Sequence, residues 1–414
     1  MNQTIKYTPN DSLAPIEVVL PRSKSLSHRH LFLRYLHGLN TVINGISSSR
    51  DTRIFQEAIE NPNLVVDFLD AGTPSRFALV YFSVINQPKT LTGNDSLKNR
   101  SISDLVTTLC QQGAQIEYLG KPGFLPIALH QGITESQAIW EINTQESSQF
   151  VSALMLGATK FNPIPKIRVK GLTHSWSYIN LSADVLKQWG FTVNLMQDEI
   201  SIGGRTRTPE AINVEIDWGS ASFVYLLAIF TNKTFRIIGA NHKSLQADYQ
   251  AVFVFESLGV KTEFVNNDAI IQYQEVPNIP IDFDGSECLD LIPALASAYA
   301  YLQKDITFFG IDKLAVKESN RLERIEFHLR QLGFSWNEKL GRYHIKNNSN
   351  NYPKHFDIYT HNDHRIAMAF APWASKIDTV RIDDTSCTEK SFPEYWELLK
   401  LCNFEVSSPN KKLS

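Results

Sequence analysis

The chain has 414 residues, which is too long for one ordinary hydrophobic core and predicts two domains. Its 43% hydrophobic and 20% charged residues are typical of a globular protein and argue against a disordered or fibrous one. A net charge of −3 provides no general attraction to nucleic acid or to an anionic membrane, so neither is expected as a partner.

The 4 cysteines are scattered and form no CxxC pair. This spacing argues against a zinc site or a disulfide framework, and it is typical of a protein in a reducing, cytoplasmic location. Residues 1–15 contain neither an apolar run nor an arginine-rich amphipathic stretch, and the sequence therefore predicts no signal or transit peptide. The longest apolar runs, such as 223–230, are too short to span a membrane.

Six times along the chain, a segment rich in Ser, Gly, Asp and charged residues leads into an almost wholly apolar, helix-like stretch. The stretches are 31–36, 77–84, 150–156, 221–230, 291–301 and 366–374. The landmark residues Ser75, Ser148, Ser220, Pro293 and His364 follow one another at intervals of 73, 72, 73 and 71 positions, whereas the first step, from Ser25 to Ser75, is 50. This regularity predicts six repeats, of which the first is shortened by about twenty residues.

An amphipathic helix follows each apolar one. In the fifth repeat Leu322, Ile325, Leu329 and Leu332 lie on one stripe, and Gly333 is placed to end the helix. The corresponding residues in other repeats are Gly113, Gly190, Gly259 and Asn403. Because helices that are apolar on every face must be surrounded, the pattern predicts an α/β (α+β) fold with helices bundled inside sheets, three repeats to a domain.

Positive charges occupy positions where helix energetics disfavour them. Lys or Arg in the first turn costs roughly 0.3–1 kcal/mol because a helix N-terminus carries partial positive charge. Such cations nevertheless stand at predicted helix starts: Lys24 with Arg29, Arg76, Lys317 with Arg321, and Arg365. One case would more often be a solvated surface charge, but four in register with a repeat indicate helix ends that converge on more than one anionic group.

Two carboxylates lie among these cations. Asp290 opens an apolar helix, and Glu318 lies between Lys317 and Arg321. Neighbouring cations favour the ionised carboxylate whereas burial raises its pKa, and opposed influences of this kind are typical of a general acid or base. Two alternatives stay open: Asp290 as a helix N-cap, and Glu318 as the i,i+3 ion-pair partner of Arg321. No Walker loop, GxGxxG or HExxH motif is present.

Taken in order, several motifs resemble those of EPSP synthases, an enolpyruvyl transferase family. The resemblance begins with PRSKSLSHR at 21–29, AGTPSR at 71–76 and the LTG segment at 91–100. It continues through SSQF at 147–150, Ser175 and Tyr178, Asp290, KESNR at 317–321, NDHR at 362–365 and KSFP at 390–393. The match covers nearly the whole chain, and its strength lies in the order of motifs that are individually weak.

The resemblance implies a fold of two domains, each of three βαβαββ units forming an inside-out α/β barrel. One domain would contain residues 1–19 and 218–414 on the phosphoenolpyruvate side. The other would contain residues 20–217 on the shikimate 3-phosphate side, with the shortened first repeat. The implied protein is a cytoplasmic monomer without metal or cofactor, whose active site lies in the cleft between the domains.

The implied reaction transfers the enolpyruvyl group of phosphoenolpyruvate to the 5-hydroxyl of shikimate 3-phosphate and releases phosphate. The residues expected around phosphoenolpyruvate are Lys24, Gly72, Arg100, Gln149, Arg321, Arg365 and Lys390. Those expected to hold shikimate 3-phosphate are Lys24, Ser25, Arg29, Ser147, Ser148, Ser175, Tyr178, Asp290 and Lys317. Asp290 would accept the hydroxyl proton, and Glu318 with Lys24 would protonate the methylene carbon. His364 is either catalytic or an orienting side chain.

The chain departs from the family pattern at several positions. Asp70 stands for the usual Asn, Ala315 for Arg and Asn320 for Asp, while Lys313 stands where many members carry a ligand-binding Asn. Asp70 is expected to place an extra negative charge near an anion site. Sensitivity to glyphosate is open, because Gly72 leaves room for it while Phe77, which replaces a frequent proline, lies close in sequence.

Two other functions remain as alternatives. UDP-N-acetylglucosamine enolpyruvyl transferases share the fold, but they usually carry a reactive Cys in the loop that corresponds to 91–103, where this chain has none. The other alternative is a catalytically inactive binding protein on the same fold. The joint presence of Lys24, Asp290, Glu318, Arg365 and Lys390 argues against it.

Overall fold

The computed structural model describes residues 3–10, 14–143, 147–171, 176–196, 198–277, 279–347 and 352–407. The chain divides into two compact units. Unit 1 contains Met1–Pro21 and Glu215–Ser414, and unit 2 contains Arg22–Val214. The chain therefore starts in unit 1, forms all of unit 2 and then returns to complete unit 1.

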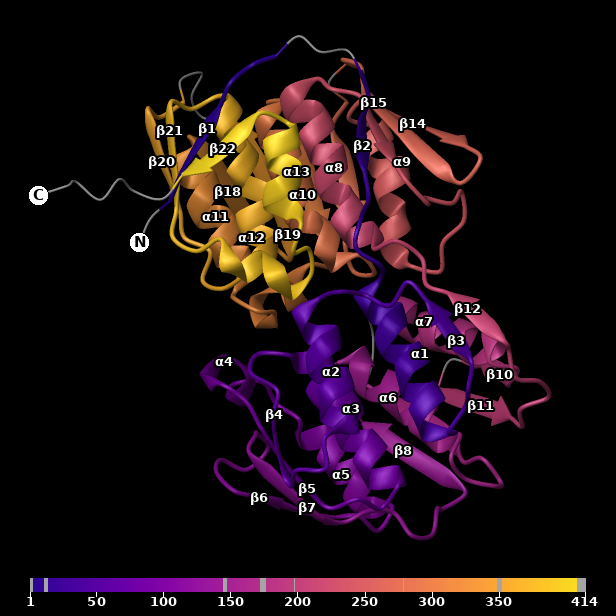
Figure 1. The fold of residues 1–414 in the computed structure, drawn as a ribbon. Helices are drawn as coiled ribbons and strands as arrows, with labels where there is room; N and C mark the ends of the chain where they lie inside the picture. The colour runs from indigo at the N-terminus through magenta and orange to yellow at the C-terminus, as the bar shows by residue number, and fades with distance from the viewer. Residues whose placement is uncertain are drawn as a thin grey trace, which may run out of the picture. The chain divides into compact units, whose positions relative to one another are not determined.

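Unit 2 is built around three buried helices (Figure 1). These inner helices are α1 (Lys24–Leu36), α3 (Gly72–Val84) and α6 (Ser148–Ala158). Every side chain from Phe77 to Val84 in α3 is buried, as the run of apolar residues predicts. The helices α3 and α6 pack so closely that a Cβ on Gly157 would lie 2.5 Å from Cγ1 of Val80, which explains the glycine in the last turn of α6.

A second set of helices covers the inner three in unit 2. These are α2 (Arg50–Glu60), α5 (Ser103–Gln111) and α7 (Trp176–Gln188), with one additional turn, α4 (Asp95–Lys98). Two four-stranded sheets lie outside them. One has the order β4 (Val65–Asp67), β5 (Lys89–Thr92), β7 (Ile127–Gln131), β6 (Gln115–Tyr118). The other has the order β8 (Ile139–Asn143), β9 (Lys166–Lys170), β11 (Glu199–Gly203), β10 (Thr192–Leu195).

The third sheet of unit 2 has two strands among the described residues. It consists of β3 (Val42–Asn44) and β12 (Ala211–Asn213), which pair in parallel with Ile43 opposite Ile212. In the two larger sheets, the corresponding parallel pair is extended by an antiparallel hairpin. The short first repeat therefore lacks the hairpin after α2, and the chain passes directly from Glu60 to β4.

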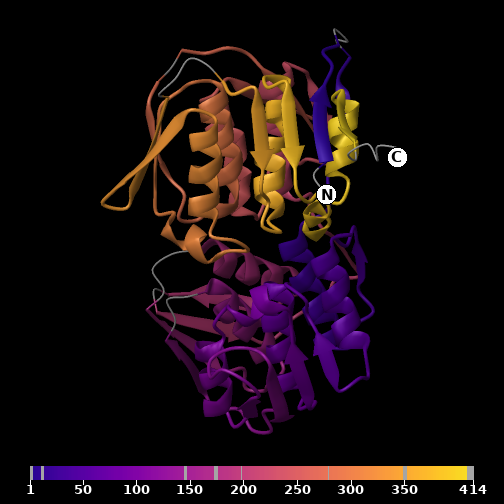
Figure 2. The ribbon, with the colours of Figure 1, turned by 90° about the vertical axis from the view of Figure 1, so that its left-hand side faces the viewer.

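Unit 1 repeats this design with three four-stranded sheets (Figure 2). Its inner helices are α8 (Trp218–Thr231), α10 (Ile292–Tyr301) and α12 (His364–Phe370), and its outer helices are α9 (Ala251–Glu256), α11 (Arg321–Gln331) and α13 (Tyr395–Leu401). Five 3₁₀ turns connect them: η1 (Ala247–Gln250), η2 (Leu289–Leu291), η3 (Asp312–Val316), η4 (Ala371–Ser375) and η5 (Ser386–Lys390). The inner helices form a continuous apolar core.

The N-terminal segment supplies two strands to the sheets of unit 1. The first sheet is β2 (Ile16–Val18), β13 (Phe235–Ile237), β15 (Asp268–Tyr273), β14 (Val260–Val265), and the second is β16 (Ile281–Asp284), β17 (Ile306–Phe309), β19 (Arg342–Asn347), β18 (Phe334–Lys339). The third is β20 (His355–Ile358), β21 (Thr379–Ile382), β1 (Gln3–Tyr7), β22 (Phe404–Ser407). β1 and β2 thus complete repeats whose other strands lie more than 200 residues later.

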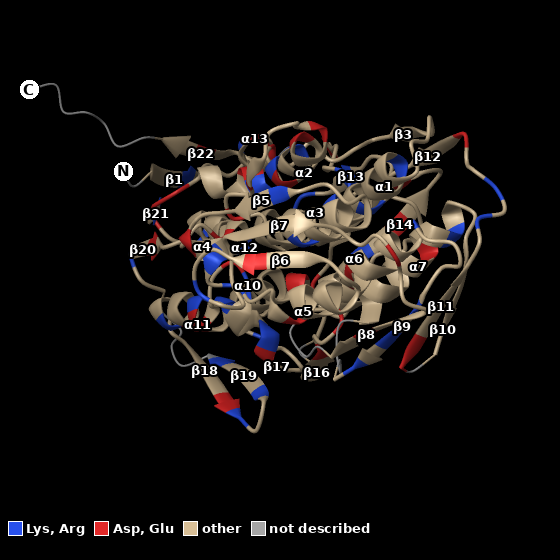
Figure 3. Cartoon of the chain, turned by 90° about the horizontal axis from the view of Figure 1, so that it is seen from below, with Lys and Arg blue, Asp and Glu red and all other residues tan. Residues whose placement is uncertain are grey.

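The predicted ends of the outer helices are confirmed. All five residues have a positive φ, which ends a helix in the left-handed region: Gly113, Gly190, Gly259, Gly333 and Asn403. Basic and acidic residues are interspersed in the view of Figure 3, in keeping with the small net charge. Within the described residues, no helix is both long and apolar enough to cross a membrane.

Candidate active site

The inner and outer helices differ in the charge of their first turns. The six inner helices have no Asp or Glu in the first turn. Four outer helices do, at Asp51, Asp104, Glu323 and Glu397. Two inner helices, α8 and α12, instead have an aspartate at the N-cap, Asp217 and Asp363. An acidic residue at a helix start neutralises the helix dipole from within the chain, so the starts of α1, α3 and α6, which lack one, keep positive potential for an external anion.

In unit 1 a buried arginine binds three carboxylates. Arg321, the first residue of α11, is only 1% exposed. Its Nη1 donates to Oδ1 of Asp290 at 2.8 Å, its Nη2 to Oε2 of Glu318 at 2.6 Å, and its Nε to Oδ2 of Asp363 at 2.8 Å. We call these four residues the Arg321 cluster. Its carboxylates outnumber its guanidinium by two, so the cluster needs further cations.

Arg365 is one of those cations. Its Nη2 donates to Oδ2 of Asp290 at 2.9 Å, and its Nη1 donates to the backbone carbonyl of Asp290 at 3.0 Å. Asp363, just before it, accepts from the Arg365 amide at 3.1 Å and so caps α12. The two oxygens of Asp290 therefore bridge two arginines that come from different repeats.

The alternative of Asp290 as an N-cap is wrong. Asp290 lies within η2, and neither η2 nor α10 has a side-chain cap. A nearby arginine pair offers its carboxylate a stronger, charge-assisted partner than a backbone amide. The i,i+3 ion pair between Glu318 and Arg321, which was the alternative interpretation of Glu318, is present in the structure.

The electrostatics of Asp290 favour its ionised form. Burial alone would raise the pKa of this carboxyl, but attraction to Arg365, Lys317 and Arg321 outweighs burial. The pKa is therefore held well below its ordinary value. In this state Asp290 is a weak base, and it becomes a stronger one only if its arginine partners are engaged elsewhere.

Asp248, in η1, was not predicted from the sequence and lies beside Arg365. A Cβ on Gly219 would be 3.0 Å from Nη2 of Arg365, 3.2 Å from Oδ1 of Asp217 and 3.2 Å from Oδ2 of Asp248. These three groups therefore surround one glycine of α8. Burial, and then repulsion from Asp290, raises the pKa of Asp248 to about 7.

This shift makes the effect of Asp248→Asn on stability depend on pH. The pKa of Asp248 rises from 3.8 in the unfolded chain to about 7, so the folded protein keeps a proton that the unfolded chain loses. The stability that comes from this proton is present below pH 3.8 and is lost as the pH rises through 7. The variant has no charge to bury, and its advantage over the wild type should grow across this window to about 1–3 kcal/mol. Melting temperatures measured from acidic to alkaline pH test this, and a difference independent of pH would contradict it.

In unit 2, the side chain of Arg29 forms hydrogen bonds to other residues within the protein. It is 1% exposed, and burial lowers its pKa to about 10. Its Nε donates to Oγ of Ser182 at 2.8 Å and its Nη1 to the carbonyl of Ser25 at 2.7 Å. Its Nη2 donates to Oγ of Ser152 and to the carbonyl of Tyr178, both at 3.2 Å. Arg29 thus fixes the backbone of two predicted substrate ligands, Ser25 and Tyr178.

Two ion pairs with α2 were not foreseen from the sequence. Nζ of Lys24 lies 2.9 Å from Oδ2 of Asp51, and Nη2 of Arg50 lies 2.6 Å from Oδ1 of Asp70. Asp70, which the sequence suggested would add a negative charge, is therefore neutralised by Arg50. The acidic first turn of α2 was the available signal for Asp51, but it is also what an ordinary helix start looks like.

Around the N-terminus of α3, predicted residues come together. The helix has no side-chain cap at Ala71, so its first amides are not satisfied in that way. A Cβ on Gly72 would be 3.0 Å from Nη1 of Arg100 and 3.8 Å from Nη1 of Arg76. Arg76 in turn donates a short hydrogen bond to Oε1 of Gln149. This end of α3 thus offers backbone amides and two guanidiniums to an anion.

Four of the other predicted residues lie at three places in the structure. Ser147 caps α6 through the amide of Gln149, while Ser148 is buried in its first turn. Lys390 is 2% exposed at the end of η5. Lys317 directly follows η3 and is partly exposed. Ser175 lies outside the described residues.

His364 is held within the core of unit 1. It is 1% exposed, and its Nε2 lies 3.0 Å from Oγ of Ser391. This contact links the start of α12 to the segment that follows Lys390, which favours an orienting role over direct catalysis. Among the described residues, no group of three or more His, Cys, Asp or Glu side chains is arranged to hold a metal ion.

Comparison with known proteins decides the family. The model of the family described as EPSP synthase (3-phosphoshikimate 1-carboxyvinyltransferase) matches residues 55–399. The chain belongs to the EPSP synthase family. It is 31% identical over 397 residues to the 3-phosphoshikimate 1-carboxyvinyltransferase of Bacteroides fragilis, which covers 94% of this chain and 95% of that protein. It is 30% identical over 409 residues to the enzyme of the same name from Salmonella schwarzengrund, with 92% and 94% covered.

Solved structures confirm the fold expected of an EPSP synthase. The EPSP synthase from Acinetobacter baumannii superposes with a TM-score of 0.75 at 19% identity, covering 98% of this chain and 100% of that one. The enolpyruvyl transferase NikO from Streptomyces tendae has a TM-score of 0.69 at 12% identity, with 99% and 100% covered. The predicted two-domain α/β fold of six repeats, with the first one short, is therefore confirmed.

Proposed function

We propose that this protein is an enzyme that transfers the enolpyruvyl group of phosphoenolpyruvate to the 5-hydroxyl of shikimate 3-phosphate. This is the activity named by its relatives, and it places the protein in the shikimate pathway of aromatic amino acid biosynthesis. The observation that carries the proposal is the bridging of Asp290 between the buried Arg321 and Arg365. Such a site can bind an anion and gain a base in the same event.

The anion-binding residues are proposed as follows. Phosphoenolpyruvate carries a phosphate and a carboxylate, which suit the forked guanidiniums of Arg321 and Arg365 in unit 1 and of Arg100 in unit 2. The other proposed contacts are Lys24, Gly72, Gln149 and Lys390. Shikimate 3-phosphate is proposed to bind Lys24, Ser25, Ser147, Ser148, Ser175, Tyr178, Asp290 and Lys317. Arg29 acts on this set by positioning Ser25 and Tyr178, because its own donors are already used.

Exchange of ion-pair partners explains how a strongly acidic Asp290 becomes a base. In the free protein Arg321 and Arg365 hold it ionised and depress its pKa. When phosphoenolpyruvate binds these arginines, its own anionic groups compete for their N–H donors. The remaining burial then raises the pKa of Asp290 toward the range of a working base. Binding of the first anion thus prepares the acceptor for the hydroxyl proton.

The chemical steps follow from this arrangement. Asp290 takes the proton of the 5-hydroxyl group. The oxygen of that hydroxyl group forms a bond to C2 of phosphoenolpyruvate. Glu318, together with Lys24, supplies a proton to the methylene carbon, which becomes a methyl group. The tetrahedral intermediate then returns one methyl proton to the group that donated it, Glu318 with Lys24, and expels phosphate, leaving the enol ether. Arginine and lysine side chains balance the phosphate charge throughout, so the reaction requires no metal.

The decisive assay measures phosphate release by the purified protein from phosphoenolpyruvate and shikimate 3-phosphate. Saturable release that requires both substrates is expected, and it should persist in EDTA. Release with UDP-N-acetylglucosamine in place of shikimate 3-phosphate would show that the protein has the related enolpyruvyl transferase activity instead. No release with either acceptor would leave the protein as an inactive member of the fold. Added glyphosate tests, in the same assay, the sensitivity that the sequence leaves open.

Gly72→Ala tests the proposed phosphoenolpyruvate contact at α3. The new Cβ would lie 3.0 Å from Nη1 of Arg100, so the guanidinium must move. Loss of one charge-assisted hydrogen bond is expected to raise KM for phosphoenolpyruvate by about tenfold, with kcat changed less. Gly204→Ala is the matched control, because a Cβ there meets nothing within 4 Å. A KM unchanged by Gly72→Ala would remove this residue from the proposed site.

We also propose that the protein works as a cytoplasmic monomer without a nucleic-acid partner. The net charge of −3 and the mixture of acidic and basic residues support the absence of a nucleic-acid partner, because neither favours a polyanion. Gel filtration at several protein concentrations tests the oligomeric state. A mass that rises with concentration would contradict the monomer.

A further inference from the structure

The segment that leads into α3 contains a buried acid. Asp70 directly precedes Ala71, the N-cap residue of the helix, and its side chain is buried. Because consecutive Cα atoms are about 3.8 Å apart, the Cα atoms of Asp70 and Gly72 are separated by at most about 7.6 Å. Salt screens charges over about 8 Å at physiological ionic strength. A charge on Asp70 therefore acts on the anion that is proposed to bind at Gly72.

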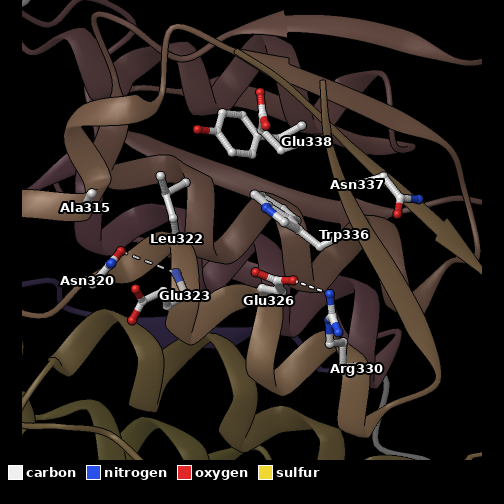
Figure 4. A pocket seen from close by; sticks show the side chains of 10 residues that line it. Ala315, Asn320, Leu322, Glu323, Glu326, Arg330, Trp336, Asn337 and Glu338 are labelled. Carbon is white, nitrogen blue, oxygen red and sulfur yellow. Dashed lines mark hydrogen bonds and ion pairs between the residues drawn. The ribbon is translucent and has the colours of Figure 1, made fainter. Parts of the chain in front are cut away.

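The start of α3 is sensitive to such a charge because no side chain caps its first amides. The outer helix α11 is different, since Oδ1 of Asn320 accepts from the amide of Glu323 at 3.4 Å (Figure 4). Beside the start of α3, Nη2 of Arg100 is buried and has no hydrogen-bond partner among the described residues. These donors suit an external anion, which an unbalanced carboxylate at Asp70 would repel.

Arg50, the first residue of α2, balances this carboxylate. Its Nη2 lies 2.6 Å from Oδ1 of Asp70, and its side chain is 26% exposed, against 4% for that of Asp70. A cation in the first turn of a helix is disfavoured by the helix dipole, so Arg50 does not stand there to stabilise α2. Its contact with Asp70 provides the reason for its position.

The turn before α3 is held independently of this ion pair. The amide of Ala71 donates to the carbonyl of Phe68 at 2.8 Å, and the amide of Asn94 donates to the carbonyl of Leu69 at 2.8 Å. Leu69 has a φ of 51°, a conformation that a leucine keeps only where its surroundings fix it. Because backbone hydrogen bonds already fix the turn, the main contribution left to Arg50 is its charge.

We propose that Arg50 is a positioning residue that keeps the start of α3 positive by neutralising Asp70, and that it thereby determines the affinity for phosphoenolpyruvate. Because the anion concerned is phosphoenolpyruvate, this role rests on the proposed function. Arg50 acts through Asp70, since the side chains nearest to a Cβ on Gly72 are those of Arg100 and Arg76, at 3.0 and 3.8 Å. The asparagine of the family pattern at position 70 would require no balancing cation.

Arg50→Met is expected to raise KM for phosphoenolpyruvate by about tenfold, with kcat changed by less than about threefold. The substitution makes the surroundings of the α3 start more negative by one unit charge, whatever else Asp70 contacts. Arg53→Met is the matched control, because Arg53 is exposed on the same helix. Its KM should stay within about twofold of wild type, since solvent screens its charge. An unchanged KM in Arg50→Met would overturn the proposal.

A double variant separates charge from structure. Arg50→Met combined with Asp70→Asn also lacks the ion pair, but its charges are balanced again. Its KM is expected to return to within about threefold of wild type. A double variant as impaired as Arg50→Met would show that Arg50 only holds the turn, and the proposal would be wrong. Asp70→Asn alone leaves an extra cation, so its KM should not exceed that of wild type, and a higher value would also contradict the proposal.

Binding measured without turnover distinguishes this role from the proposed function. Melting temperatures of the full chain are followed during titration with phosphoenolpyruvate in the absence of shikimate 3-phosphate. Arg50→Met is expected to need about tenfold more ligand than wild type for half of the shift, and the double variant is not. If this order is found but wild type releases no phosphate in the two-substrate assay, only the proposed function fails. If wild type releases phosphate but all variants bind equally, only the role of Arg50 fails, and no shift for wild type would overturn both.

Discussion

Asp290→Asn is expected to lower kcat by about 10²–10⁴-fold while leaving the affinity for phosphoenolpyruvate within about threefold of wild type. Asparagine has nearly the shape of aspartate and can still accept a hydrogen bond from Arg321 or Arg365. It cannot take the proton of the 5-hydroxyl. The substitution also removes the carboxylate that competes with phosphoenolpyruvate for the guanidiniums of Arg321 and Arg365. These two arginines are therefore expected to bind the anionic substrate at least as well as in the wild type.

The measurement for Asp290 pairs steady-state kinetics with direct binding of phosphoenolpyruvate in the presence of shikimate 3-phosphate. Asp282→Asn is a suitable control, because Asp282 is an exposed aspartate that forms a surface ion pair with Arg342 in the same unit. Such pairs contribute about 0–1 kcal/mol, so both kcat and binding should stay near wild type. Equal loss of binding and turnover in Asp290→Asn would show that the carboxylate is mainly structural.

The fold could be predicted far into its details because its signals are local. A helix buried on all sides, such as α3 or α8, has an apolar residue at nearly every position, and this is visible without any partner. The stop at Gly333 needs only a left-handed φ of 89°, which glycine adopts without strain. The repeat added long-range information, because six copies of one pattern imply the same packing six times.

The closure of the first repeat could not be predicted in this way. The short interval between the first two landmark residues gave the length of the deletion but not its position in the repeat. The structure shows that β3 pairs with β12, which lies about 170 positions later, and that no hairpin in the described part of the chain extends this sheet. Strand pairing over such a separation depends on the closure of the whole unit. The identity of the partner is therefore absent from the local pattern of residues 42–44.

The sequence predicted which helix starts carry cations, but it did not predict which carboxylates pair with them. The excess of cations at helix starts was recognised because it conflicts with the helix dipole. The partners Arg50 and Asp51 escaped notice because they lie at an ordinary helix start, 20 and 27 positions from the groups they neutralise. Asp290 illustrates the same limit, since an N-cap and an ion pair both require an aspartate before a helix. Only the position of α11 and α12 decides between them.

Arg321→Met is expected to destabilise unit 1 by about 3–5 kcal/mol, the cost of leaving buried carboxylates without their cation. Arg321 bonds to Asp290, Glu318 and Asp363 and is 1% exposed, so water cannot replace its guanidinium. Arg324→Met, three residues later on the same helix, removes a guanidinium that is 27% exposed and 3.7 Å from Glu323. This control is expected to lose no more than about 1 kcal/mol.

The dependence on pH separates lost charge balance from lost packing in Arg321→Met. Arg321 is one of three cations, after Arg365 and Lys317, that hold the pKa of Asp290 below its ordinary value, so loss of the guanidinium raises that pKa. The stability that comes from a lowered carboxyl pKa is present above the unfolded value of 3.8 and is lost as the pH falls through the folded pKa. The gap in melting temperature to wild type should therefore be smaller at about pH 3 than at pH 8, and Asp363→Asn added to the variant should narrow it at pH 8. A gap that is equal at both pH values would mean that Arg321 stabilises the unit by packing alone. The ion pairs of the Arg321 cluster would then make no contribution to stability.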